Sequence, residues 1–184
     1  MKVAFLDRDG VINHEVNYLH RISDFKYTHR CIEGLRIIAS LGYKLAIITN
    51  QAGIAKGIFT EEQYKSLTEW MLSDLKNNGV EILECLYCPH HPDAKIKKYR
   101  TKCEFRKPGT KMLEAIKSRH NVDMNKSILI GDKISDIRSA NSSGVGQAFL
   151  VKSGHPIVPH QLLDAEFDLA DDLYSVATHL FNCS

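Results

Sequence analysis

The chain has 184 residues, of which 43% are hydrophobic and 25% charged, the balance of a globular protein with a buried core. Its net charge of +2 is too small to indicate binding to nucleic acid or to a membrane surface. Five scattered cysteines argue against a secreted disulfide framework, and the apolar run before Asp7 is too short for a signal peptide or a membrane span. We therefore expect a single domain (1–184) that is cytoplasmic and monomeric.

Strand and helix patterns alternate along the chain. Short apolar runs without polar alternation are typical of parallel strands that helices cover on both faces, and apolar residues at helical spacing lie between them. In chain order we expect a strand at 3–6, a helix at 34–41, a strand at 44–48, a helix from the capping-box pair Thr60 and Gln63, a weaker strand at 81–86, a helix at 110–119, a strand at 127–130, a helix after Ser135, a strand at 147–151 and a helix at 173–180. This order predicts an α/β fold with an open parallel sheet, helices on both faces and no large cap domain.

Polar residues follow three of these strands, at the edge where ligands of parallel sheets bind. They are 7–10, 49–51 and 131–133. Asp7 and Asp9 repel each other unless a cation or a proton intervenes, and carboxylate oxygens suit Mg²⁺. A turn with solvated acids is the alternative, whereas a calcium loop is excluded because its fifth and sixth positions would be Val11 and Ile12.

Four segments resemble, in order, the motifs of the haloacid dehalogenase superfamily of phosphatases. They are Phe5-Leu6-Asp7-Arg8-Asp9-Gly10-Val11, Ile47-Ile48-Thr49-Asn50-Gln51, Arg106-Lys107-Pro108 and Ile130-Gly131-Asp132-Lys133-Ile134-Ser135-Asp136. The resemblance implies a Rossmann-like fold and Mg²⁺-dependent hydrolysis of a phosphate monoester. Residues 13–18, 49–54, 88–92 and 103–108 are similar, more narrowly, to the subgroup of heptose-bisphosphate and histidinol-phosphate phosphatases.

The resemblance implies a role for each matching residue. Asp7 would be the nucleophile, Asp9 the general acid and base, and Thr49 and Lys107 the contacts of the transferring phosphoryl oxygens. Mg²⁺ would be held by Asp7, the backbone carbonyl of Asp9, and Asp132, while Asp136 would either orient Lys107 or support the metal. The expected substrate contacts are Glu15, Val16, Asn17, Tyr18, Asn50, Gln51, Arg106 and Lys133.

A loop at about 85–107 is dense in cysteine, histidine and proline. Cys88, His90 and Cys103 resemble the subgroup's pattern of structural zinc ligands, C-x-H followed by C-x-C, except that Phe105 stands at the last position. A fourth ligand could come from His91, Glu104, Cys85 or water; otherwise the loop packs with free thiols. The remaining histidines, His155 among them, are expected to be surface or core residues.

The expected substrate is a small sugar phosphate. The narrower resemblance implies removal of the 7-phosphate of D-glycero-D-manno-heptose 1,7-bisphosphate, with the β anomer as the expected form, in the synthesis of nucleotide-activated heptose for lipopolysaccharide. Histidinol phosphate is the alternative substrate. A non-catalytic phosphate-binding module is the alternative of another class, and the presence of Asp7, Asp9, Lys107 and Asp132 argues against it.

Overall fold

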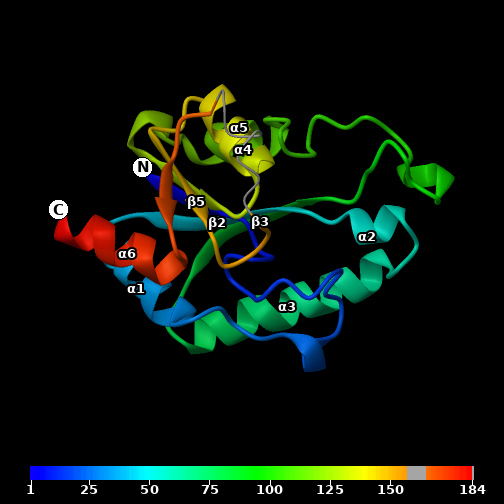
Figure 1. Ribbon diagram of the computed structural model, residues 1–184, viewed down its shortest axis with the longest axis horizontal. Helices are drawn as coiled ribbons and strands as arrows, with labels where there is room; N and C mark the ends of the chain where they lie inside the picture. The colour runs from blue at the N-terminus through cyan, green and yellow to red at the C-terminus, as the bar shows by residue number, and fades with distance from the viewer. Residues whose placement is uncertain (157–164, 184) are drawn as a thin grey trace.

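A parallel β-sheet between two layers of helices forms the body of the protein (Figure 1). The computed structural model describes residues 1–156 and 165–183, and in these residues the sheet has six strands in the order β3-β2-β1-β4-β5-β6, with every neighbouring pair parallel. Their bounds are β1 Val3–Leu6, β2 Lys44–Asn50, β3 Ile82–Cys88, β4 Ile128–Gly131, β5 Gln147–Val151 and β6 Asp168–Ala170. The predicted fold class is confirmed.

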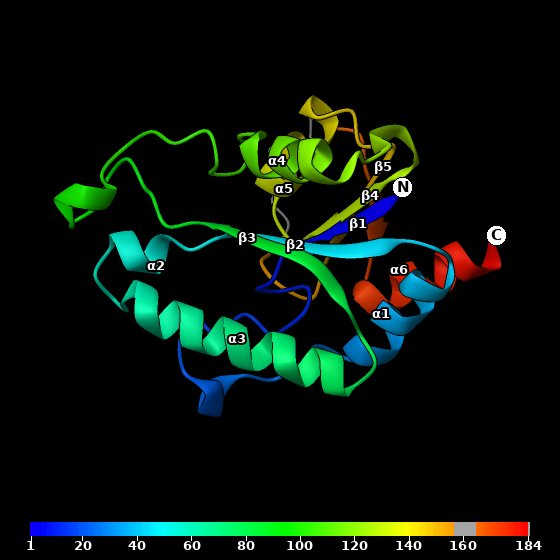
Figure 2. The same ribbon diagram turned by 180° about the vertical axis from the view of Figure 1, so that it is seen from behind.

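Helices cover both faces of this sheet (Figure 2). They are α1 Cys31–Ser40, α2 Ala52–Ala55, α3 Glu61–Asn77, α4 Lys111–His120, α5 Ile134–Ser142 and α6 Leu173–Asn182, with short 3₁₀ turns η1 Ile22–Asp24, η2 Lys97–Tyr99 and η3 Met124–Lys126. One core packs α1, α3 and α6 against the sheet, and a second core packs α4 and α5 against the other face. Since side chains alternate along a strand, Ala4 and Leu6 enter the first core, and Val3 and Phe5 enter the second.

The predicted strands and helices agree with the observed ones to within a few residues, but α2 and β6 were not predicted. The helix expected from Thr60 begins there as α3, because the Thr60 hydroxyl accepts from the backbone N–H of Gln63 and the Gln63 side chain accepts from that of Thr60. α2 has four residues, too few to show a helical period. The strand β6 also lacks a signal. It has only three residues, two of them exposed, so it carries no apolar run.

The order of the strands brings distant polar segments to one edge. β1 lies between β2 and β4, and Leu6 is in register with Ile47 of β2 and Ile130 of β4. The chain leaves β1 toward one side of the sheet and β4 toward the other, which is the kind of switch point where parallel sheets bind ligands. In the described part of the chain, no helix combines the length and the apolar character that a membrane span requires.

Candidate active site

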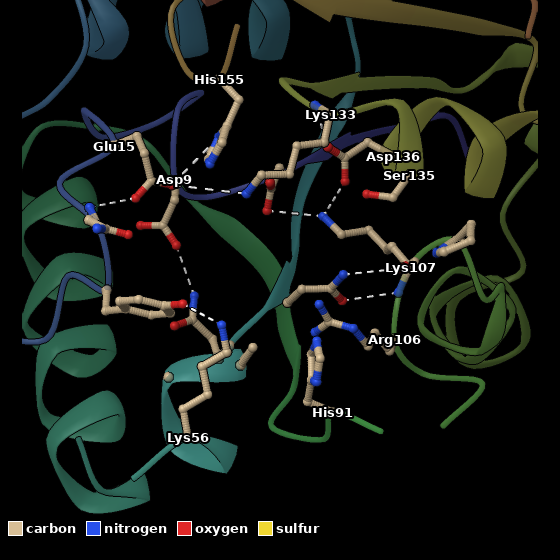
Figure 3. Close-up of a pocket in the computed structure, with 18 residues that line it drawn as sticks. Asp9, Glu15, Lys56, His91, Arg106, Lys107, Lys133, Ser135, Asp136 and His155 are labelled. Carbon is tan, nitrogen blue, oxygen red and sulfur yellow. Dashed lines mark hydrogen bonds and ion pairs between the residues drawn. The ribbon is translucent and has the colours of Figure 1, made fainter. Parts of the chain in front are cut away.

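A cleft of about 450 Å³ opens beyond the carboxyl ends of β1, β2 and β4 (Figure 3). Lysine, arginine and histidine side chains surround it on several sides, whereas Asp9 and Glu15 lie together on another (Figure 3). The sequence-predicted residues that line it are Asp7, Asp9, Glu15, Asn17, Tyr18, Asn50, Gln51, Arg106, Lys107, Lys133 and Asp136. Thr49 and Asp132 are buried behind them, and Val16 is 44% exposed outside the cleft.

Three buried carboxylates gather at the base of the cleft. Asp7, Asp132 and Asp136 each offer an oxygen, and these oxygens lie within 4.8 Å of one another. Lys107 reaches the same point: its Nζ lies 3.0 Å from Asp7 and 2.6 Å from Asp136, and it donates to the Ile48 carbonyl at 2.8 Å. Burial alone would lower the pKa of Lys107, but Asp136 and Asp7 raise it above its ordinary value, so the ammonium stays charged.

The two oxygens of the Asp132 carboxylate have different surroundings. Oδ2 is bonded to the backbone N–H and the Nδ1 of His155, whereas Oδ1 is buried and has no hydrogen-bonding partner among the residues that the structure describes. Burial, followed by the nearby charge of Asp7, raises the pKa of Asp132 to about 7. A buried polar atom without a partner indicates a missing ligand, and clustered carboxylate oxygens are what Mg²⁺ prefers. The donor set therefore fits Mg²⁺.

The carboxylate of Asp9 lies outside this trio and has its own set of donors. Both of its oxygens lie 3.0 Å from the Arg8 guanidinium, and the side-chain amides of Asn13 and Gln51 donate to it at 3.0 Å. Arg8 is itself buried and packs over the Tyr64 ring. Burial would raise the pKa of Asp9, but the attraction of Arg8 and these hydrogen bonds lower it below the usual value.

The polar residues at the carboxyl end of β2 mainly hold their neighbours in place. The Asn50 amide forms two hydrogen bonds of 3.0 Å with the backbone N–H and carbonyl of Lys107. The Thr49 hydroxyl accepts from the Gln51 side chain at 2.9 Å. Asn50 therefore fixes the position from which Lys107 reaches the carboxylates. Its expected role as a substrate contact did not predict these bonds to the Lys107 backbone.

The rim of the cleft includes a strained segment. Asn17 and Tyr18 adopt left-handed φ angles of 55° and 71°, which are uncommon for residues other than glycine and which concentrate at functional sites. The Tyr18 hydroxyl lies 2.5 Å from Lys56 Nζ, and Glu15 accepts from the Asn17 backbone. Glu15, Asn17 and Tyr18 all line the cleft.

Sequence patterns did not identify four polar residues that line the cleft, namely Lys56, His91, Ser135 and His155. His155, expected to be a surface or core residue, is partly exposed and forms a hydrogen bond with Asp132 at the base of the cleft. His155 follows β5, so the rule that ligands bind beyond strand ends could have found it. The same rule could not have found Lys56 or His91, because each lies in a connecting segment and does not directly follow a strand.

The Cys/His loop brings its three predicted ligands together. Atoms of Cys88, His90 and Cys103 lie within 4.8 Å of one another, with Cys88 Sγ 3.8 Å from His90 Nδ1. Ligands at bond lengths of about 2.0–2.3 Å around a tetrahedral zinc lie roughly 3.3–3.8 Å apart, so the cluster has a suitable size. Phe105 is 39% exposed and supplies no ligand atom.

The comparisons with known proteins agree with this geometry. The family model described as "Polynucleotide kinase 3 phosphatase" matches residues 2–174. A Photorhabdus laumondii protein named D-glycero-α-D-manno-heptose-1,7-bisphosphate 7-phosphatase is 53% identical over 85% of this chain and 85% of its own. An Escherichia coli K12 protein named for the β anomer is 41% identical over 84% of this chain and 81% of its own.

A solved structure shares the whole fold. The D,D-heptose 1,7-bisphosphate phosphatase from B. bronchiseptica, complexed with magnesium and phosphate, superposes with a TM-score of 0.84 at 25% identity and with 100% of both chains covered. The chain therefore belongs to the polynucleotide kinase 3 phosphatase family of the haloacid dehalogenase superfamily, in the group of the heptose-bisphosphate 7-phosphatases.

Proposed function

We propose that this protein removes the 7-phosphate of D-glycero-D-manno-heptose 1,7-bisphosphate through a phospho-aspartate formed on Asp7. The observation that carries the proposal is the buried trio of Asp7, Asp132 and Asp136 with Lys107 against it, at the base of a cleft. The names of the relatives support the choice of substrate. A non-catalytic binding module has no use for three buried carboxylates, which destabilise the fold unless a cation joins them.

In the proposed reaction Asp7 attacks phosphorus, and the bond from phosphorus to the sugar oxygen breaks as the acyl phosphate forms. Asp9 gives a proton to the departing oxygen and then takes one from the water that hydrolyses the acyl phosphate. Lys107 and Thr49 stabilise charge on the transferring oxygens, and Asp136 orients Lys107. Mg²⁺, held by Asp7, Asp132 and the backbone carbonyl of Asp9, would offset repulsion between carboxylate and phosphate.

To act as a general acid, Asp9 must be protonated, but the positive charge of Arg8 favours the ionised carboxylate. Its pKa is lowered while Arg8 and the amides surround it. A phosphate dianion in the cleft raises the pKa of a neighbouring carboxyl group by repulsion. Substrate binding thus shifts Asp9 toward the protonated form in which it can act as an acid.

The rim suits a substrate with a second anionic group. Arg106, Lys56 and His91 face the cleft from the side away from His155 (Figure 3). A sugar bisphosphate can place one phosphate at Asp7 and the other among these side chains, with Glu15, Asn17 and Tyr18 near the sugar. Histidinol phosphate carries an amine and no second phosphate, so this cationic rim favours the bisphosphate.

Phosphate release from a substrate panel tests the proposal. The panel contains both anomers of the heptose bisphosphate and histidinol phosphate, each with Mg²⁺ and with EDTA. The expected β anomer agrees with the names of relatives at 41–44% identity, and the 53% relative is named for the α anomer, so both are needed. Faster release from histidinol phosphate would refute the choice of substrate.

Two variants test the chemistry. Asp7→Asn should abolish turnover while substrate binding persists, and substantial residual activity would remove Asp7 as the nucleophile. Asp9→Asn should stop turnover or trap the phospho-enzyme, which acid quenching with labelled substrate detects; unchanged turnover would exclude the acid and base role.

We also propose a structural zinc ion at Cys88, His90 and Cys103, with water as the fourth ligand. The support is the size of the cluster and its soft donors. Burial raises the pKa of the Cys88 thiol to about 12, so zinc must displace a proton there. Metal analysis of protein purified without chelator tests the proposal; less than about a tenth of an equivalent of zinc would refute it.

A further inference from the structure

The segment after β5, residues 152–156, packs tightly on two of the motifs. The Ser153 hydroxyl donates to the Gly10 carbonyl at 2.6 Å. Side chains at Gly10 or Gly154 would overlap the carboxylate of Asp132, so both positions require glycine for this close approach. The segment therefore carries His155 to a defined position beside Asp132.

His155 supplies two donors to the same carboxylate oxygen. Its backbone N–H lies 3.0 Å from Asp132 Oδ2, and its ring Nδ1 lies 2.7 Å from that atom. Beside an ionised carboxylate Nδ1 carries the hydrogen and donates it. These two bonds occupy Oδ2, while Oδ1 is buried and no residue in the described ranges bonds to it.

The surroundings make such an anchor necessary. Asp132 is fully buried at its side chain and faces Asp7 and Asp136, which repel it. The His155 ring has a second acid nearby, since Glu15 Oε2 lies 3.8 Å from Nδ1, and Lys133 Nζ lies 4.0 Å from the same oxygen. The ring is 40% exposed, and its outer edge borders the cleft (Figure 3).

We propose that His155 is a positioning residue that holds Oδ2 of Asp132, so that Oδ1 is presented to the divalent cation. The inference rests on the proposed Mg²⁺-dependent function. Partners that bond the outer atom of a metal ligand restrict its orientation, and their loss typically lowers metal affinity roughly 10- to 100-fold. The His155 side chain contributes the hydrogen bond from its ring, and the backbone N–H contributes the other.

Substitutions at this position separate the two ring nitrogens. His155→Ala keeps the backbone donor and removes the ring. His155→Asn places an amide N–H near the position of Nδ1, whereas His155→Gln places one near that of Nε2. His29→Ala is the matched control, because His29 is exposed, packs near the Tyr174 ring and does not line the cleft.

Calorimetric titration with Mg²⁺ of metal-free protein is the measurement. We expect Mg²⁺ affinity to fall roughly 10- to 100-fold in His155→Ala and His155→Gln and to stay within about threefold of the parent in His155→Asn and His29→Ala. In phosphate release, the Ala variant should require more Mg²⁺ for half-maximal rate and regain most of its kcat at saturating Mg²⁺.

Two results would overturn the inference: an Ala variant that binds Mg²⁺ within about threefold of the parent, or Asn and Gln variants that are weakened equally. If the Ala variant does not fold, the Asn and Gln pair decides. A parent protein that binds Mg²⁺ but does not release phosphate from the heptose bisphosphates would refute the proposed function alone. A parent that binds no Mg²⁺ would refute both.

Discussion

Lys107→Met removes one buried positive charge and keeps most of the side-chain volume. In the parent, the ammonium lies 3.0 Å from Asp7 and 2.6 Å from Asp136, and its side chain is 2% exposed. Asp132 lies in the same cluster. In metal-free protein the substitution leaves the buried carboxylates of Asp7 and Asp136 without the ammonium that contacts both, and the charge of Lys133 acts on them without contact. We expect a large loss of folding stability in metal-free protein and a partial recovery of stability when Mg²⁺ is added.

The distances set the size of the effect. With an effective dielectric constant of about 20, the attractions are about 5.5 kcal/mol to Asp7 at 3.0 Å and about 6.4 kcal/mol to Asp136 at 2.6 Å. Dehydration of the ammonium, which the variant avoids, offsets several kcal/mol of this, and proton uptake by the carboxylates offsets more. The net loss expected for removing one partner of a buried ion pair is about 3–5 kcal/mol.

Urea unfolding in EDTA and in Mg²⁺ measures this loss. Lys107→Met should regain part of its stability when Mg²⁺ is added, and a second substitution, Asp136→Asn, should restore at least about 1 kcal/mol by removing one unpaired charge. Lys126→Met is the control, because Lys126 is exposed in its pair with Asp123 and should change stability by less than about 0.5 kcal/mol. A loss below about 1 kcal/mol for Lys107→Met in EDTA would refute the reasoning.

Three further predictions concern pH, Asp9 and zinc. The pKa of Asp132 is raised to about 7 in the folded protein, so its contribution to stability is present in acid and is lost as pH rises through 7. The free energy of unfolding of metal-free protein should therefore fall between pH 5 and 7 by up to about 1.4 kcal/mol per pH unit. The fall should be smaller in Asp132→Asn. Urea unfolding at several pH values measures it, and an equal fall in parent and variant would contradict the prediction. In Asp9→Asn, phospho-enzyme formation from a sugar phosphate should be slowed at least about tenfold more than formation from p-nitrophenyl phosphate, because only the sugar needs a proton from Asp9; equal losses of that rate would contradict this role. Phe105→Cys should supply a fourth protein ligand, the third thiolate of the site, and raise zinc affinity in competition with a chromophoric chelator; unchanged affinity would refute the zinc site.

Local patterns predicted the framework of the fold because their signals lie within a few residues. The apolar runs of β1 and β4 and the Thr60 capping box each depend on neighbours in sequence. The strand β6 was not predicted, because its residues form no apolar run and it joins the sheet by pairing with β5. Edge strands of this kind depend on a partner that is distant in the chain.

The amino-acid sequence by itself determined the parallel α/β architecture, the superfamily and the identity of the acids at the strand ends. Only the tertiary structure decided how those acids are partnered: Asp136 with Lys107, Asp132 with His155, and Asn50 with the backbone of Lys107, 57 residues away. The physical reason is that hydrogen bonds and ion pairs depend on distances of a few ångströms, and these are set by strand order and register across the sheet. No local pattern in the chain encodes that order.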